Sequence, residues 1–269
     1  MNRKISLLIL AVFGLATFGS AQSPTTLAAR DVYHKYQEST VVITAVSTIH
    51  FTTDGAPLPT QDRRAQTLGT IISKNGLIMI SNSAIDLAVG MKGNRGRPAG
   101  SQDFVTVVEA RSVFQEIQIN LADGSEYHAS KIDEDVDLDL AFLMIDKRQI
   151  NERKKALPFV DLSNKIVEGQ ISIADEVIGL SRSSPVYAYI PSVIPGYVTA
   201  ISKRNVTYYL TTAGTAQGMP IFSLDGKFVG LTVQRIIEGQ RTNLLGTLGA
   251  GAVKTGADMA AGMRGNSGP

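Results

Sequence analysis

Few residues in this chain could perform acid–base or nucleophilic chemistry. Its 269 residues include three histidines and no cysteine. Thiol catalysis and disulfides are therefore excluded, and zinc could be held only by histidine and carboxylate ligands. His34 is expected on the surface of a leading helix, His50 at the end of a long strand, and His128 just after an Asp-Gly turn. We predict that all three are structural or solvated rather than catalytic.

Two other patterns resemble sites. The run Asp133-Glu-Asp-Val-Asp-Leu-Asp139 has alternating carboxylates, but it lacks the later glycine and the bidentate glutamate of a calcium loop. We predict a solvated turn that leads into a strand. The motif Gly265-Asn-Ser-Gly-Pro269 has no strand after it that could hold Ser267, so we interpret it as a tail. The sequence thus predicts no metal and no cofactor.

The elements that would position reactive residues are mainly β-strands. Residues 40–49 alternate and are rich in β-branched side chains, as strands are. Asn75-Gly76, Asp123-Gly124 and Asp225-Gly226 separate strand-like runs, as tight hairpin turns do. Repeated short strands favour an all-β barrel or sandwich. The glycine-rich stretch 86–110, with three basic residues before Gly100, is expected to be a long mobile loop.

The N-terminus has the pattern of a secretory signal. Arg3 and Lys4 precede an apolar run over residues 5–18, and small residues follow. We predict a signal peptide over 1–21, an exported protein in the periplasm or outside the cell, and no membrane span after cleavage. An uncleaved anchor is the alternative. The 26 basic residues less the two in the signal balance 24 acidic residues, which argues against nucleic-acid binding.

Four segments resemble the HtrA/Deg branch of the trypsin-like serine proteases. Gly69–Ile85 is similar to the stretch with the catalytic histidine, and Leu121–Leu143 to the stretch with the aspartate. Asp175–Ala200 and Gly218–Gly230 resemble strands before and after the nucleophile. The resemblance implies two six-stranded β-barrels with a cleft between them and a short N-terminal helix. The PDZ domain usual in that branch has no counterpart in this sequence.

The predicted organisation follows from these segments. It comprises the signal 1–21, a lead with a short helix 22–38, a first barrel 39–150, a linker and second barrel 151–237, and a Gly/Ala-rich, partly disordered segment 238–269.

The resemblance places unsuitable residues at two of three catalytic positions. Ser83 stands where the family has histidine, and a hydroxyl cannot act as a base near neutral pH. Gln217 stands where the family has serine, and an amide cannot form an acyl-enzyme. Asp139 matches but has no histidine to orient. The loop that forms the oxyanion hole is degenerate as well, at Thr215, Gly218 and Met219.

We therefore predict a pseudo-protease that binds a peptide or protein partner, for example by strand addition in its cleft. A purely structural subunit is an open alternative, and so is an oligomer. The competing hypothesis is a hydrolase with a rearranged site. In that case Ser83 or Asp139 would take part, or the threonines Thr211, Thr212 and Thr215.

Overall fold

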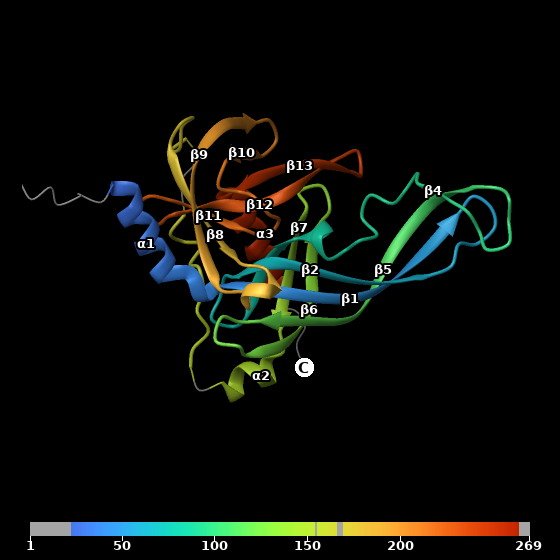
Figure 1. The fold of residues 1–269 in the computed structure, drawn as a ribbon, viewed down its shortest axis with the longest axis horizontal. Helices are drawn as coiled ribbons and strands as arrows, with labels where there is room; N and C mark the ends of the chain where they lie inside the picture. The colour runs from blue at the N-terminus through green and yellow to red at the C-terminus, as the bar shows by residue number, and fades with distance from the viewer. Residues whose placement is uncertain (1–22, 154, 166–168, 264–269) are drawn as a thin grey trace, which may run out of the picture.

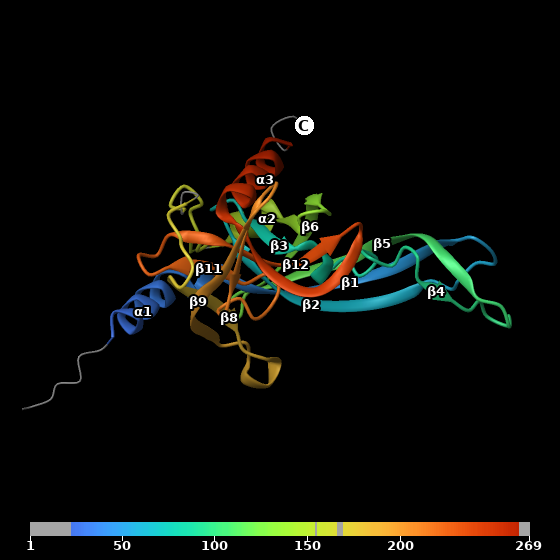
Figure 2. The same cartoon turned by 90° about the horizontal axis from the view of Figure 1, so that it is seen from above.

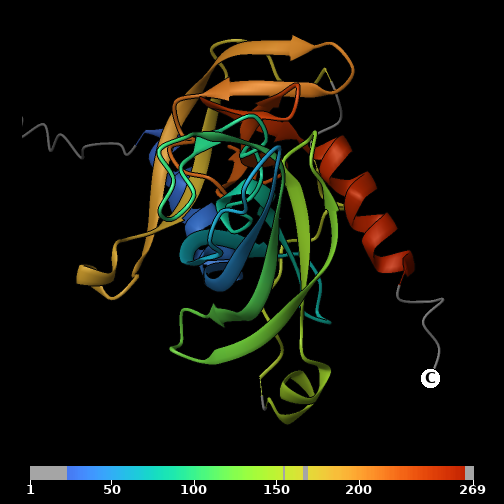
Figure 3. The ribbon, with the colours of Figure 1, turned by 90° about the vertical axis from the view of Figure 1, so that its right-hand side faces the viewer.

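The computed structural model describes residues 23–153, 155–165 and 169–263. The predicted signal and Ser267 lie outside the described residues. Two β-barrels lie side by side, and two longer helices pack on them (Figures 1 and 3). Helix α1 (Pro24–Tyr36) contacts the second barrel, whereas α3 (Ala250–Met263) contacts strands of both barrels. In the described part of the chain, no helix is long and apolar enough to cross a membrane.

The first barrel closes six antiparallel strands, because β1 pairs with both β2 and β5. A short additional strand, β4, pairs with β5. In chain order the strands are β1 (Thr40–Thr53), β2 (Gln61–Ile71), β3 (Leu77–Ser81), β4 (Arg95–Gly96), β5 (Val105–Asn120), β6 (Glu126–Asp135) and β7 (Leu140–Ile145). Branched side chains from alternate positions, such as Ile43, Ile78 and Leu143, fill its interior.

The second barrel closes six more strands, so the predicted double barrel is confirmed. Its strands are β8 (Glu176–Arg182), β9 (Pro191–Lys203), β10 (Thr207–Thr211), β11 (Pro220–Ser223), β12 (Phe228–Ile237) and β13 (Gln240–Gly249). A core shared with the first barrel includes Phe142 and Phe222. Tyr36 of α1 stacks on Phe222 with ring centroids 4.6 Å apart, which fixes the helix to the second barrel.

The segment that begins at residue 238 differs from the sequence prediction. Through residue 263 it forms β13 and α3, so the second barrel extends beyond residue 237. Its small residues permit close packing. A Cβ on Gly256 would lie 3.0 Å from the Phe142 ring, and one on Gly249 would lie 3.0 Å from the Thr207 carbonyl oxygen. A composition typical of loops therefore reflects tight contacts here.

Strands β1, β2 and β5 continue beyond the first barrel as a long arm (Figures 1 and 2). Strand β1 pairs with β2 as far as Ile49 and with β5 as far as Thr53. The stretch 86–110, predicted as a loop, contributes β4 and the beginning of β5 to this arm. The prediction is wrong there because Val105 and Val107 are buried in the arm, where cross-strand pairing outweighs the glycine-rich composition.

The linker between the barrels is attached to the first barrel by Arg153. This residue follows α2 (Lys147–Glu152) and donates to Asp123 Oδ2 at 2.7 Å and Tyr127 Oη at 2.6 Å. Partial burial disfavours the Asp123 carboxylate, but hydrogen bonds from Ser125 and Arg153 outweigh it and lower the pKa of Asp123 to about 2.

The low pKa of Asp123 predicts a pH-dependent contribution to stability. A depressed folded-state pKa stabilises the protein above pH 3.8, and this contribution is lost as the pH falls toward 2. We expect Asp123→Asn to lower the free energy of unfolding at pH 7 by about 1 kcal/mol, since the carboxylate is partly exposed and screened. The difference from wild type should vanish near pH 2. Urea unfolding at several pH values measures this, and Asp137→Asn, at an exposed carboxylate, is the control.

Candidate functional site

The three predicted catalytic positions meet between the barrels. Ser83 lies in the 3-10 turn η2 (Asn82–Ala84) after β3, Asp139 immediately precedes β7, and Gln217 lies between β10 and β11. The Ser83 backbone nitrogen donates to Asp139 Oδ1 at 2.6 Å, and Gln217 Nε2 donates to Ser83 Oγ at 2.9 Å. The tertiary structure therefore brings together the residues that the sequence singled out.

The Asp139 carboxylate is buried and accepts hydrogen bonds from both barrels. Besides the Ser83 nitrogen, it accepts from the Ser81 hydroxyl and, at 2.8 Å, from the backbone nitrogen of Gln234 on β12. Burial raises the pKa of Asp139, although these donors offset part of the effect. The residue itself has a left-handed backbone, with φ 55°. This carboxyl group thus joins the barrels, and burial disfavours its charged form.

The Gln217 carboxamide covers two hydroxyl groups. Its Nε2 lies 2.9 Å from both Ser81 Oγ and Ser83 Oγ, and Ser83 Oγ donates in turn to Gln234 Oε1 at 3.2 Å. The two serines are 0 and 1% exposed. Both hydroxyls are therefore engaged with neighbours and shielded from solvent.

Sequence reasoning missed Ser81 and Gln234. Ser81 could have been found, because a polar residue that ends the apolar strand Leu77–Ser81 must find a buried partner. Nothing in the sequence marked Gln234, since only the pairing of β12 with β13 turns its backbone toward Asp139.

The loop at Thr215 does not present a free oxyanion hole. The Thr215 nitrogen donates to the Ala213 carbonyl oxygen at 3.1 Å, and the Gly218 nitrogen donates to the Thr232 oxygen at 2.8 Å. Met219 is fully buried in a cluster with Val42 and Leu68 between the barrels. The N–H groups of Thr215 and Gly218 are therefore already engaged with acceptors of the protein itself.

The three histidines make their contacts away from this site. His34 packs against Tyr33 on α1, His128 Nδ1 lies 3.6 Å from Glu116, and His50 pairs with Arg111 on the arm. None of their described contacts involves Ser83, Asp139 or Gln217. Since these are all the histidines of the chain, the site has no imidazole base.

The acidic run before Asp139 comprises the end of β6 and a turn over residues 136–139. Asp135 Oδ1 accepts from the Leu138 nitrogen at 2.9 Å, Asp133 Oδ1 accepts from the Glu134 nitrogen at 2.9 Å, and Glu134 pairs with Lys131 at 2.8 Å. Within the described ranges, no three His, Asp or Glu side chains are gathered to hold a metal ion.

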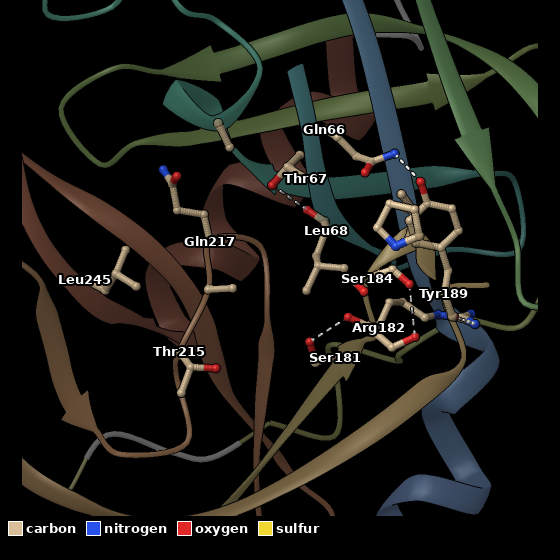
Figure 4. A pocket seen from close by; sticks show the side chains of 15 residues that line it. Gln66, Thr67, Leu68, Ser181, Arg182, Ser184, Tyr189, Thr215, Gln217 and Leu245 are labelled. Carbon is tan, nitrogen blue, oxygen red and sulfur yellow. Dashed lines mark hydrogen bonds between the residues drawn. The ribbon is translucent and has the colours of Figure 1, made fainter. Parts of the chain in front are cut away.

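The space between the barrels differs on the two sides of Gln217. On one side lies a cavity of about 490 Å³ (Figure 4), bounded by Leu68 of β2, Tyr189 and the Thr215 loop. On the other side the β12–β13 hairpin is tied to the first barrel. Arg241 Nη2 donates to the Asp86 oxygen at 2.7 Å, and Gln240 Nε2 donates to the Lys92 oxygen at 2.8 Å. One half of the cleft is open and the other is bridged.

Two closed barrels with three converging positions have a counterpart among known families. A model described as the trypsin-like peptidase domain matches residues 67–231, which is more than half of the chain. The protein belongs to this family. A comparison with curated proteins found no match. The matched range begins in β2 and ends in β12, so this trypsin-like domain includes all three positions of the site.

Gly218 fixes the distance between the site loop and the first barrel. Its φ is +79°, and a Cβ there would lie 1.9 Å from the Leu68 carbonyl oxygen. We expect Gly218→Ala to lower the free energy of unfolding by about 3 kcal/mol or more. Gly100→Ala is the matched control, because φ is +75° but a Cβ would meet nothing within 4 Å. It should cost only about 1 kcal/mol. If urea unfolding shows the same loss of free energy for Gly218→Ala and Gly100→Ala, the close contact between Gly218 and the Leu68 carbonyl group is contradicted.

Asp139 should matter for stability in this trypsin-like domain. Asp139→Ala leaves the buried nitrogens of Ser83 and Gln234 without acceptors, which should lower the free energy of unfolding by about 3 kcal/mol. Thermal or urea unfolding measures the loss. Asp137→Ala removes an exposed carboxylate two residues away and should leave stability nearly unchanged. If Asp139→Ala leaves the free energy of unfolding unchanged, the carboxylate does not join the barrels.

Proposed function

We propose that the protein is a catalytically inactive member of the trypsin-like family that binds a peptide or protein partner between its barrels. One observation carries this proposal. The Gln217 carboxamide occupies the nucleophile position and donates to both buried hydroxyls of the site. An amide has no nucleophilic oxygen for acyl transfer, and its two serine neighbours are covered by it.

The acid–base requirements of the family support the same conclusion. Acyl transfer by serine needs a base that accepts the hydroxyl proton, and loss of the serine or the histidine costs on the order of a million-fold in rate. Asp139 is the only carboxylate bonded within the site, and each of its oxygens already accepts a backbone N–H. Although Ser81 donates to Asp139, that hydroxyl is fully buried and cannot reach a substrate.

A rearranged hydrolase has weaker support. Thr212 Oγ1 accepts from the Tyr197 nitrogen at 2.8 Å, and Thr211 Oγ1 accepts from the Gly214 nitrogen at 3.1 Å. Thr215 Oγ1 lies 3.5 Å from Met219 Sδ. These hydroxyls therefore stabilise the loop, and none of their described partners is a base. A purely structural role would not explain why one half of the cleft keeps an open cavity. The proposal therefore favours partner binding.

Export and membership in the HtrA/Deg branch also belong to this proposal. The N-terminal pattern over residues 1–21 supports export, and the four matching segments support the branch. Expression of the full chain followed by N-terminal sequencing tests export, and a mature protein that begins near Gln22 is the expected result.

Activity assays test the lack of catalysis. We expect wild type, Gln217→Ala and Asp139→Ala neither to cleave labelled casein nor to react with a fluorophosphonate probe. The double variant Ser83→His/Gln217→Ser should react slowly with the probe, because Asp139 is already placed to orient an imidazole. Each single change should remain unreactive and serves as the matched control.

One outcome would overturn the proposed inactivity. Cleavage by wild type that Asp139→Ala abolishes, in a variant whose circular dichroism spectrum shows that it is folded, would establish a working site.

A further inference from the structure

Strand β2 has a long edge with no neighbouring strand. It pairs with β1 from Gln61 to Thr70, but with β3 only at Thr70 and Ile71. Within the described residues, no strand pairs with the other edge of residues 61–69. Leu68 and Gly69 are buried, and Gly218 packs against the Leu68 carbonyl group, so the open part of this edge is residues 61–67. An edge of this length presents a row of backbone donors and acceptors that another extended chain can complete.

The free edge leads directly into the open half of the cleft. Gln66, Thr67 and Leu68 line the cavity beside Gln217, while residues 61–65 continue outward along the arm (Figures 2 and 4). Gln66 Nε2 donates to Tyr189 Oη at 2.8 Å, so the edge is connected to the β8–β9 loop across the cavity. The edge and the cavity therefore form one continuous surface.

The β8–β9 loop adds apolar area to this surface. Val186, Tyr187 and Ile190 are 86, 66 and 58% exposed. Between them Ala188 and Tyr189 have φ values of 52° and 53°, a conformation that costs free energy in non-glycine residues. Grouped exposed apolar side chains beside a cavity are typical of a protein-binding surface.

The charges of this surface favour an acidic partner. Arg63 and Arg64 are exposed on the β2 edge, and neither forms an ion pair within the described residues. Arg182 lines the cavity and is buried, and its guanidinium donates to carbonyl oxygens, including those of Thr40 and Tyr189. No carboxylate lines the cavity. Asp62 is the exposed carboxylate next to Arg63 and Arg64, and its Oδ1 accepts from Thr48 Oγ1. Two exposed arginines beside one carboxylate leave a net positive charge for an anionic group bound here.

The other half of the cleft is less accessible, since Gln240 and Arg241 bridge it to the Lys92 and Asp86 carbonyl groups. We propose that the partner is an extended polypeptide segment that adds a strand to the free edge of β2. Acidic side chains of this segment face Arg63 and Arg64, and an apolar side chain enters the cavity between Leu68 and Tyr189. This inference rests on the proposed function, because the segment must be bound without being cut.

Selection from a display library of random peptides tests the inference. Peptides of roughly twelve residues are long enough to cover 61–67 at about 3.3 Å per residue. We expect wild-type protein to enrich peptides that combine acidic and apolar residues. Amide hydrogen exchange should show that the best peptide protects residues 61–67, because strand addition fills the open hydrogen bonds of the edge.

Matched variants separate this surface from the rest of the arm. Arg63→Glu/Arg64→Glu should weaken binding of the selected peptide about tenfold, whereas Arg111→Glu on β5 should have little effect. Val186→Ser/Tyr187→Ser should also weaken it, unlike Val108→Ser/Val113→Ser at exposed positions of β5. N-methylation of alternate peptide backbone nitrogens should abolish binding, because it removes the donors needed for strand addition.

Three results would overturn the inference. The first is no enrichment of peptides. The second is protection of residues 234–237 instead of 61–67. The third is a free protein that self-associates in sedimentation experiments and whose β2 edge is already protected from exchange. Protection of 234–237 would leave the proposed function intact and reject only this surface. Cleavage of the selected peptide by wild type would reject the proposed function wherever the peptide binds.

Discussion

A single buried carboxyl group constrains how the two barrels meet. Asp139 can remain buried only if its oxygens are supplied with donors, and the first barrel provides only part of the set through Ser81 and Ser83. The backbone nitrogen of Gln234 completes it from the second barrel. The position of β12 relative to Asp139 is thereby constrained, because a shift of either would leave a buried acceptor or a buried N–H without a partner.

Gln217 extends the network around Asp139. Its carboxamide donates to the hydroxyls of Ser81 and Ser83, so these buried groups stay hydrogen-bonded. In the loop around it, the N–H groups of Thr215 and Gly218 donate to the Ala213 and Thr232 carbonyl oxygens. A hydrogen-bonded polar network of this kind favours one rigid arrangement of its groups.

Rigidity at the centre contrasts with openness at one side. The β12–β13 hairpin is held to the first barrel through Gln240 and Arg241, while the cavity beside Leu68 and the unpaired edge of β2 remain uncovered. The long arm extends this free edge of β2 well beyond the cleft, and an unpaired edge can pair with another extended chain.

The sequence alone determined the repeated strands and the three site positions. Alternating branched residues and Asn-Gly or Asp-Gly turns depend on neighbours in the chain, and the four matching segments supplied the order of the elements. Composition misjudged residues 105–110, where cross-strand pairing outweighs the glycine-rich stretch before them. It also misjudged the segment from 238, since glycine and alanine there serve contacts with partners distant in sequence, such as Phe142 against Gly256. Only the tertiary structure decided the roles of Ser81 and Gln234, the bond from the Gly218 N–H to the Thr232 oxygen and the bridged half of the cleft. Each of these depends on a hydrogen bond between distant backbone or side-chain groups, and local pattern carries no information about such bonds.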